Sequence, residues 1–251
     1  MTVPSEKIRT FTTMILTAHQ PVYLPWLGLF HKIALADTFV SFNQVQYLPK
    51  DWNNRNLIKT PRGPEWLSVP VMRKGYIEKP ISQIEIAYDT PWRRKHWRTM
   101  CANYRGTPYF ARYADFFEDV YQREFKYLAE INDYMLKWFL ATLGIEVVFE
   151  AASNHNFKGQ KSELVLDMCR TMGASSYIFG AMGEDYADIA AFEEAGIKLK
   201  FQAYQHPQYI QAYGEFVSKL SIVDLLFNCG EASMDILMSG NLQRSDLVAT
   251  T

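Results

Sequence analysis

A regular alternation of strand and helix patterns in the C-terminal part of the chain constrains the fold more than any other feature. Apolar runs typical of buried strands alternate with amphipathic helical patterns in the order 145–149, 161–172, 177–179, 186–195 and 197–201. Glycines stand where helical patterns should end, at Gly144, Gly173 and Gly196. Alternation of this kind predicts a parallel sheet with helices on both faces.

The N-terminal part supplies two further strand patterns for this sheet. The run 14–16 and the segment 38–42 have strand character, and the helical pattern 28–34 lies between them. We therefore predict an α/β fold of the Rossmann-like, three-layer type, with a mostly parallel sheet flanked by helices and a β-hairpin and helical insertion. The predicted parts are a disordered leader at 1–13 and a single domain at 14–251, with the insertion at about 53–143.

The insertion is predicted to begin with a hairpin. Strand patterns at 56–60 and 65–69 flank the turn residues Pro61-Arg62-Gly63-Pro64. The segment 81–88 alternates apolar and polar residues, which indicates another strand.

Helices are expected after this segment. Asp89-Thr90-Pro91-Trp92 predicts a helix start, with a capping side chain followed by proline. Apolar residues recur every three or four positions from Tyr121 to Thr142, which predicts one long amphipathic helix. Near the C-terminus, Ser221 caps a predicted helix that ends at Gly230.

Composition argues against several classes of protein. The chain is 48% apolar with a formal net charge of −1, so we expect a large core and predict neither nucleic acid nor an anionic membrane as the main partner. The three cysteines form no C-x-x-C pair, and no H-E-x-x-H motif or carboxylate-rich cluster occurs, so no metal site is predicted. No apolar run reaches the length of a membrane-spanning helix, and we expect a cytoplasmic protein. The oligomeric state is left open.

The segment His19-Gln20-Pro21-Val22-Tyr23-Leu24-Pro25-Trp26 follows the first predicted strand and precedes a helix. Its two prolines restrict the backbone around a set of hydrogen-bonding side chains. Ligands of α/β folds commonly bind at such strand-to-helix turns, where backbone N–H groups at the helix start are free. The alternative is that Tyr23, Leu24 and Trp26 simply fill the core.

A similar combination occurs beyond the last predicted strand, at His206-Pro207-Gln208-Tyr209. The proline holds His206 in an extended conformation, and an imidazole suits proton transfer near neutral pH. We predict His206 as the first candidate acid–base residue and His19 as the second. A purely structural role is the alternative for each.

The loops around 19–26, 52–59 and 204–211 are expected to assemble this site at one end of the sheet. Two other segments are open to both a functional and a structural interpretation. The basic segment 92–98 either clamps phosphates or forms a solvated helix face, and 180–186 is either a ligand-binding turn or a plain connection. The predicted substrate-binding residues are Gln20, Tyr23, Trp26, Gln46, Trp52, Arg55, Asn56, Lys59, His96, Tyr209, Gln211, Asp224 and Asn228.

With these residues in view, the chain resembles the WbqC-like protein family from about Ile15 to Asp235. Two positions depart from the usual pattern: Asn43 stands where an acidic residue is common, and Val217-Ser218 replaces Val-Pro. The matching words are His19–Gly28, Ala36–Val40, Asn53–Ile58, His96-Trp97, Pro108–Phe110, Gly173-Ala174, His206–Tyr209 and Ser221–Asn228.

The resemblance implies a transferase of bacterial surface-polysaccharide (O-antigen, lipopolysaccharide) biosynthesis, with aminoacyl (glycine) transfer to an amino sugar as the suggested reaction. The acceptor would be a nucleotide-linked or lipid-linked amino sugar. One alternative is a nucleotidyltransferase-like enzyme that activates an acid with ATP, in which His19, Arg55 and Lys59 hold phosphates. Another is a non-catalytic protein that binds sugar nucleotides. No cofactor is predicted, and ATP or an activated acyl donor is compatible with these interpretations.

Overall fold

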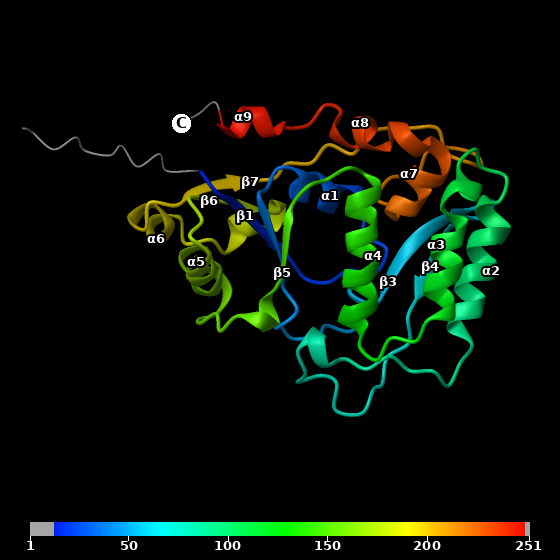
Figure 1. Cartoon of the computed structure of the whole chain (residues 1–251), viewed down its shortest axis with the longest axis horizontal. Helices are drawn as coiled ribbons and strands as arrows, with labels where there is room; N and C mark the ends of the chain where they lie inside the picture. The colour runs from blue at the N-terminus through cyan, green and yellow to red at the C-terminus, as the bar shows by residue number, and fades with distance from the viewer. Residues whose placement is uncertain (1–12, 249–251) are drawn as a thin grey trace, which may run out of the picture.

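A parallel sheet of five strands occupies the left half of Figure 1, in a computed structural model that describes residues 13–248. The strand order is β5-β2-β1-β6-β7, so β1 lies in the middle. The first four residues of β1 are buried, as expected for a strand covered on both faces. The strands are β1 (Ile15–His19), β2 (Thr38–Ser41), β5 (Val148–Ala151), β6 (Ser176–Phe179) and β7 (Lys198–Phe201).

Helices cover both faces of the sheet, which confirms the predicted three-layer α/β fold. On one face, Leu16 and Val40 belong to the same core cluster as Cys169 of α5 and Phe192 of α6. On the other face, α1 and α4 pack together, with α8 and α9 beside them at the top of Figure 1. The bounds are α1 (Leu27–Ala34), α4 (Leu128–Thr142), α5 (Lys161–Met172), α6 (Ile189–Glu194), α8 (Ser233–Met238) and α9 (Arg244–Val248).

A second group of elements extends from the face that carries α4. It contains the predicted antiparallel hairpin and three helices, and aromatic side chains hold it together. Phe227 contacts both Phe110 and Phe117, which joins α7 to α3. The elements are β3 (Arg55–Thr60), β4 (Gly63–Ser68), α2 (Trp92–Tyr104), α3 (Phe110–Gln122) and α7 (Ile222–Cys229).

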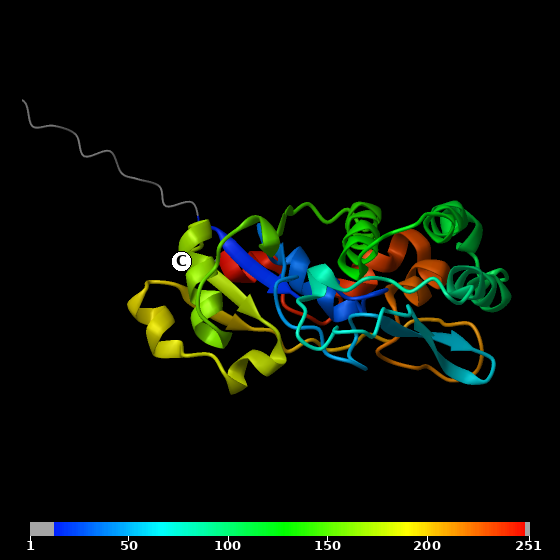
Figure 2. The same ribbon diagram turned by 90° about the horizontal axis from the view of Figure 1, so that it is seen from below.

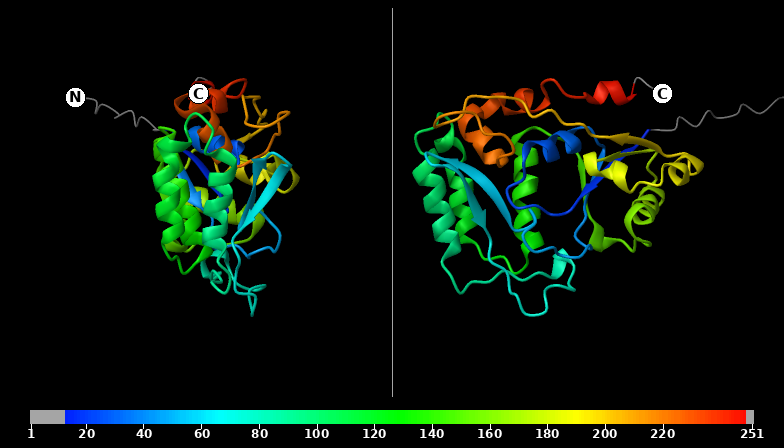
Figure 3. Two further views of the ribbon diagram at one scale, coloured as in Figure 1. Left: turned by 90° about the vertical axis from the view of Figure 1, so that its right-hand side faces the viewer. Right: turned by 180° about the vertical axis from the view of Figure 1, so that it is seen from behind.

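Residues 202–221, which we call the strap, connect β7 to α7 without forming a helix or strand. Figure 2 and Figure 3 show the strap running back across the molecule and alongside the hairpin. At its end, the Ser221 N–H donates to the Leu57 carbonyl of β3, and Ser221 forms a β-bridge with Trp26. The strap therefore joins the segment after β1 to the hairpin.

Several predicted boundaries were wrong. The segment 81–88 is not a strand: it holds a short 3₁₀ turn (Ile81–Gln83) and then makes only isolated bridges. Its backbone instead bonds the start of α4, where the Leu128 N–H donates to the Ile84 carbonyl. The alternating pattern arose because this segment buries Ile84 and Ile86 between other elements.

The single long helix predicted from Tyr121 to Thr142 is in fact the end of α3 followed by α4. The chain turns extended at Arg123, and Glu130 Oε2 accepts from the Tyr127 N–H at the start of the second helix. Apolar spacing continues across the break because both helices face the same core.

Smaller differences concern caps and ends. Pro91 itself is the N-cap of α2 and no side chain caps that helix, whereas Ser221 caps α7 as predicted. The strand predicted at 145–149 is shifted to β5, and the helix predicted at 186–195 is the shorter α6. The predicted disordered leader, apart from Thr13, lies outside the described residues, and the single-domain assignment stays a prediction.

Candidate functional site

The chain changes direction across the sheet between β1 and β6. From β1 it passes through α1 to β2 on one side, and from β6 it passes through α6 to β7 on the other. The loops at the carboxyl ends of β1 and β6 therefore diverge. This is the position at which open α/β sheets bind their ligands.

The segment after β1 is fixed by the residues that precede the hairpin. Asn53 donates from Nδ2 to the Pro21 carbonyl at 2.9 Å and to Gln20 Oε1 at 3.2 Å. Asn56 donates to the Leu24 carbonyl at 2.7 Å. Two of the three predicted loops thus come together at the edge, and Asn56 acts as a backbone clamp.

His19, the last residue of β1, has a defined tautomer. Its Nδ1 lies 2.8 Å from the Gln20 carbonyl, which only accepts, so Nδ1 carries the proton and Nε2 presents a lone pair. Burial, together with the nearby charge of Lys32, lowers the pKa of His19 to about 4. His19 is therefore a neutral base at neutral pH.

Lys32 reaches the same edge from α1. It is 4% exposed, and its Nζ donates to the Ala18 carbonyl at 2.9 Å. Burial lowers its pKa to about 8, so it keeps its charge at pH 7. Among residues 13–248 it makes no ion pair. A buried ammonium without a carboxylate is costly, so it marks a place where negative charge is stabilised.

A third titratable group is bonded to β2, the strand next to β1. Ser41 is the register partner of His19 in β2 and donates from its hydroxyl to Oδ1 of Asp133 at 2.7 Å. Burial raises the pKa of Asp133 to about 6. The pKa values of three side chains at one end of the sheet are thus shifted, those of His19, Lys32 and Asp133. Groups with shifted pKa values occur most often at functional sites.

Two buried amide oxygens at this edge lack a partner in the described part of the chain. They are Oδ1 of Asn53 and Oδ1 of Asn132 on α4. The two side chains adjoin, because Asn132 donates from Nδ2 to the Asn53 carbonyl at 2.8 Å. Buried acceptors are normally bonded, so these oxygens fit hydroxyl or amine donors of a ligand.

Other predicted site residues form internal networks. The Tyr23 hydroxyl lies 2.9 Å from His96 Nδ1 and 2.6 Å from the Tyr121 hydroxyl, and all three side chains are buried. Burial lowers the pKa of His96 to about 3. Trp26 packs edge-on against Tyr204 of the strap. These residues hold the segment after β1 against the helices rather than facing a ligand.

A second network fastens the strap to the hairpin and α7. Oδ1 and Oδ2 of Asp224 accept from the hydroxyls of Tyr104 and Tyr209 at 2.8 and 2.9 Å. Lys59 donates from Nζ to Gln211 Oε1 at 2.9 Å. Asn228 accepts from a strap N–H at 3.0 Å. The polar groups that the sequence predicted as ligand contacts thus form hydrogen bonds within the protein.

His206 lies on the strap, apart from His19. Its Nδ1 donates to the Pro207 carbonyl at 2.9 Å, and its ring contacts those of Tyr209 and Phe216, which also contact each other. Its Nε2 is buried without a described partner, and burial lowers its pKa. No described hydrogen bond or ring contact joins the two histidines, so the structure does not bring the two predicted catalytic residues together.

The remaining candidates surround the base of the hairpin. Arg55 stacks on Trp66 at 4.3 Å and donates to the Lys50 carbonyl, and Trp66 in turn packs against the half-exposed Trp52. Gln46 donates to the Ile77 carbonyl at 2.6 Å. Gln46 and the two tryptophans are exposed here.

The sequence model of the WbqC-like protein family matches residues 20–236. The chain belongs to the WbqC-like protein family. It is also 33% identical over 220 residues to Rv1507c, an uncharacterized protein of Mycobacterium tuberculosis, which covers 87% of this chain and 95% of that protein. The predicted family resemblance is confirmed, and the matched range of this WbqC-like chain contains Lys32, Asn53, Asn132 and Asp133.

Sequence reasoning missed Lys32, Asn132 and Asp133. Lys32 carried a usable signal, because it and His31 are the polar residues of a mostly apolar helix, Leu27–Ala34. The two α4 residues carried none, since a polar pair on a long helix is normally solvated.

In the turn 180–186, Gly183 is required for packing: an added Cβ would lie 2.4 Å from the Phe179 side chain.

The helices and the potential metal ligands of residues 13–248 both bear on the possible functions of the molecule. None of the helices there combines the length and the apolar character needed to cross a bilayer. Within the same residues, no three His, Cys, Asp or Glu side chains are grouped as metal ligands.

Proposed function

We propose that this protein is an acyltransferase that joins an activated amino acid to the amine of an amino sugar, at the carboxyl edge of the sheet. The observation that carries the proposal is the neutral His19, whose tautomer is fixed by the Gln20 carbonyl, beside the buried charge of Lys32. An amine that attacks a carbonyl carbon needs a base for its proton and a positive charge near the developing oxyanion. This pair supplies both.

In the proposed reaction the amine nitrogen forms a bond to the carbonyl carbon of the donor. His19 Nε2 takes the amine proton, and the Lys32 ammonium stabilises the negative oxygen of the tetrahedral intermediate. The bond from carbon to the leaving group then breaks, and that group departs with the electron pair and the proton from His19. Asn53 and Asn132 offer acceptors for sugar hydroxyls.

The nucleotidyltransferase-like alternative is less well supported. It needs Arg55 and Lys59 at the phosphates of a nucleotide. Arg55 is stacked on Trp66, and Lys59 is bonded to the strap at Gln211 and at the Glu215 carbonyl. No described contact links either cation to His19. The sugar-nucleotide binding alternative remains an outcome of the test.

The test is product formation by the full chain. Glycine with ATP, or a glycyl thioester, is incubated with nucleotide-linked amino sugars, and mass spectrometry detects the added glycyl group. His19→Asn should lower the rate by about 10²-fold or more, the usual contribution of a general base. His155→Asn is the matched control, since His155 lies a few residues beyond β5 of the same sheet but bonds Glu150.

Full activity of His19→Asn would overturn the assignment of the base. If the wild-type chain binds an amino-sugar nucleotide but turns over no donor, the protein is a binding protein and the proposal fails.

A further inference from the structure

A basic groove lies between the hairpin turn and α2. Figure 1 shows that α2 is on the side of the hairpin away from the five-stranded sheet. Its cavity measures about 820 Å³. Four cations line it: Arg62 from the turn, and Arg94, Lys95 and Arg98 from α2. Glu65 is the one carboxylate among its lining residues. We refer to this cavity, with its four cations, as the basic groove.

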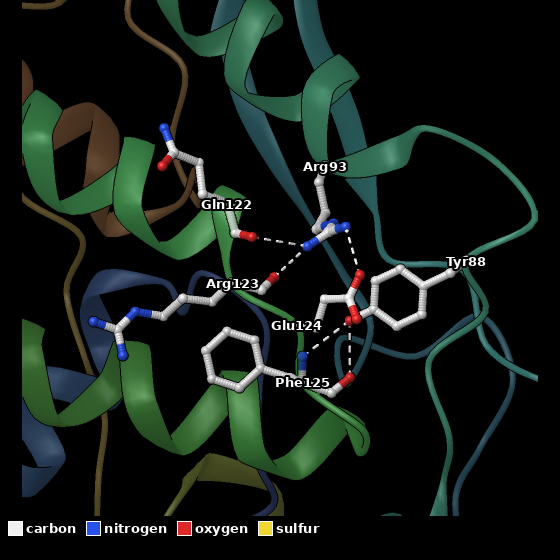
Figure 4. A network of polar contacts seen from close by, with 6 residues as sticks. All are labelled: Tyr88, Arg93, Gln122, Arg123, Glu124 and Phe125. Atoms are coloured by element: carbon white, nitrogen blue, oxygen red, sulfur yellow. Dashed lines mark hydrogen bonds and ion pairs between the residues drawn. The ribbon is translucent and has the colours of Figure 1, made fainter.

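These four side chains differ from the paired arginines of the same chain. Arg93, their neighbour, donates to the Gln122 and Arg123 carbonyls and pairs with Glu124, so it closes the end of α3 (Figure 4). The four side chains of the basic groove have no ion pair and no hydrogen bond within residues 13–248. The groove thus concentrates unpaired positive charge in a chain whose net charge is only −1.

The position of two of these cations is electrostatically unfavourable without an anion. Arg94 and Lys95 lie in the first turn of α2, a helix of 13 residues that has no acidic residue there. The N-terminal end of a helix already carries partial positive charge, so further cations at that end raise the energy. An anion beside the first turn offsets both contributions.

A smaller cavity continues the basic groove and shows a second sign of a ligand. It measures about 340 Å³ and shares Glu65, Pro91 and Lys95 with the groove. Trp92 lines it, is 5% exposed, and keeps a buried indole Nε1–H without a partner in the described residues. Buried indole N–H groups usually find an acceptor.

We propose that the basic groove binds the phosphate or diphosphate of a phosphorylated ligand of about nucleotide size. Guanidinium groups form paired hydrogen bonds with phosphate oxygens, and three of the four cations are arginines. The volume falls in the range of small-molecule sites. The smaller cavity, with Trp66 and Trp92, adds aromatic surface for the rest of the ligand. This proposal stands whether or not His19 is a catalytic base.

The test is calorimetric binding of inorganic pyrophosphate and of uridine diphosphate to the full chain at low salt. Arg94→Ala/Arg98→Ala should weaken binding at least tenfold. Arg112→Ala/Arg123→Ala is the matched control, because it removes the same charge from exposed, paired arginines. His19→Asn should bind both probes like the wild type, which separates this result from the test of catalysis.

A second arm identifies the source of the phosphate. Co-sedimentation with vesicles of phosphatidylcholine and phosphatidic acid, lost in the Arg94→Ala/Arg98→Ala variant alone, would assign the groove to a lipid phosphate. Binding of the soluble probes alone assigns it to a nucleotide. Equal behaviour of the two double variants, or no binding of any probe by the wild type, would overturn the proposal.

Discussion

Replacing Asp224 with alanine should destabilise the fold strongly, although the sequence marks this residue as a ligand contact. Its side chain is 0% exposed and accepts from the hydroxyls of Tyr104 and Tyr209. Alanine leaves both hydroxyls without this acceptor, at about 1–3 kcal/mol each, so we expect a loss of about 3–5 kcal/mol in the free energy of unfolding. For a chain of this length, that lowers Tm by about 6–20 °C.

Asparagine at the same position should be tolerated. The Tyr104 hydroxyl already accepts from the Lys59 N–H, so it must donate, and the amide oxygen of asparagine can receive that proton. The amide nitrogen can donate to the Tyr209 oxygen. Burial raises the pKa of Asp224, so the substitution also removes a charge that the interior disfavours. We expect a change of about 1 kcal/mol or less.

Calorimetry and urea unfolding of the two variants check this reasoning, with activity measured in parallel. Alanine within about 1 kcal/mol of the wild type would contradict the structural role. So would an Asp224→Asn variant that keeps its Tm but loses turnover, because Asp224 would then act on substrate.

Two further predictions concern the other buried groups. Tyr23→Phe removes a hydroxyl that bonds His96 and Tyr121, so the free energy of unfolding should fall by about 1–2 kcal/mol while ligand affinity stays unchanged, as thermal unfolding and calorimetry would show. The pH profile of kcat/KM should be bell-shaped: it rises through about pH 4 as His19 becomes neutral and falls through about pH 8 as Lys32 loses its charge. Lys32→Arg should abolish the alkaline limb, and a limb that persists would refute the role of Lys32.

The parallel sheet could be predicted because its strands are short apolar runs separated by helices that end at glycines. Gly173, for example, has φ of 73° at the end of α5, a conformation that favours glycine. The segment 81–88 misled the prediction, since alternation alone does not reveal whether a partner strand exists. The break between α3 and α4 was missed because both helices face the same core, so the apolar spacing continues across the extended residue Arg123.

The candidate site was predictable only in part. His19 and Gln20 stand out because prolines and polar groups follow a buried strand. Tyr23 and Asp224 carry similar polar groups, but only tertiary contacts reveal that their hydrogen bonds are already satisfied inside the protein. Lys32 is separated from His19 in the sequence by a loop and most of a helix, so its effect on His19 depends on the fold.

Buried polar atoms without partners give the strongest reason to look for a ligand near the hairpin base. In the described part of the chain six such atoms occur, and Asn53, Asn54 and Arg55 contribute three of them in consecutive positions. Asn132 contributes a fourth, and its amide contacts Asn53. A fold that needed this segment only for packing would gain by pairing these atoms or replacing them with apolar groups. Their concentration between the sheet edge and the hairpin therefore favours a ligand that supplies the missing donors and acceptors there.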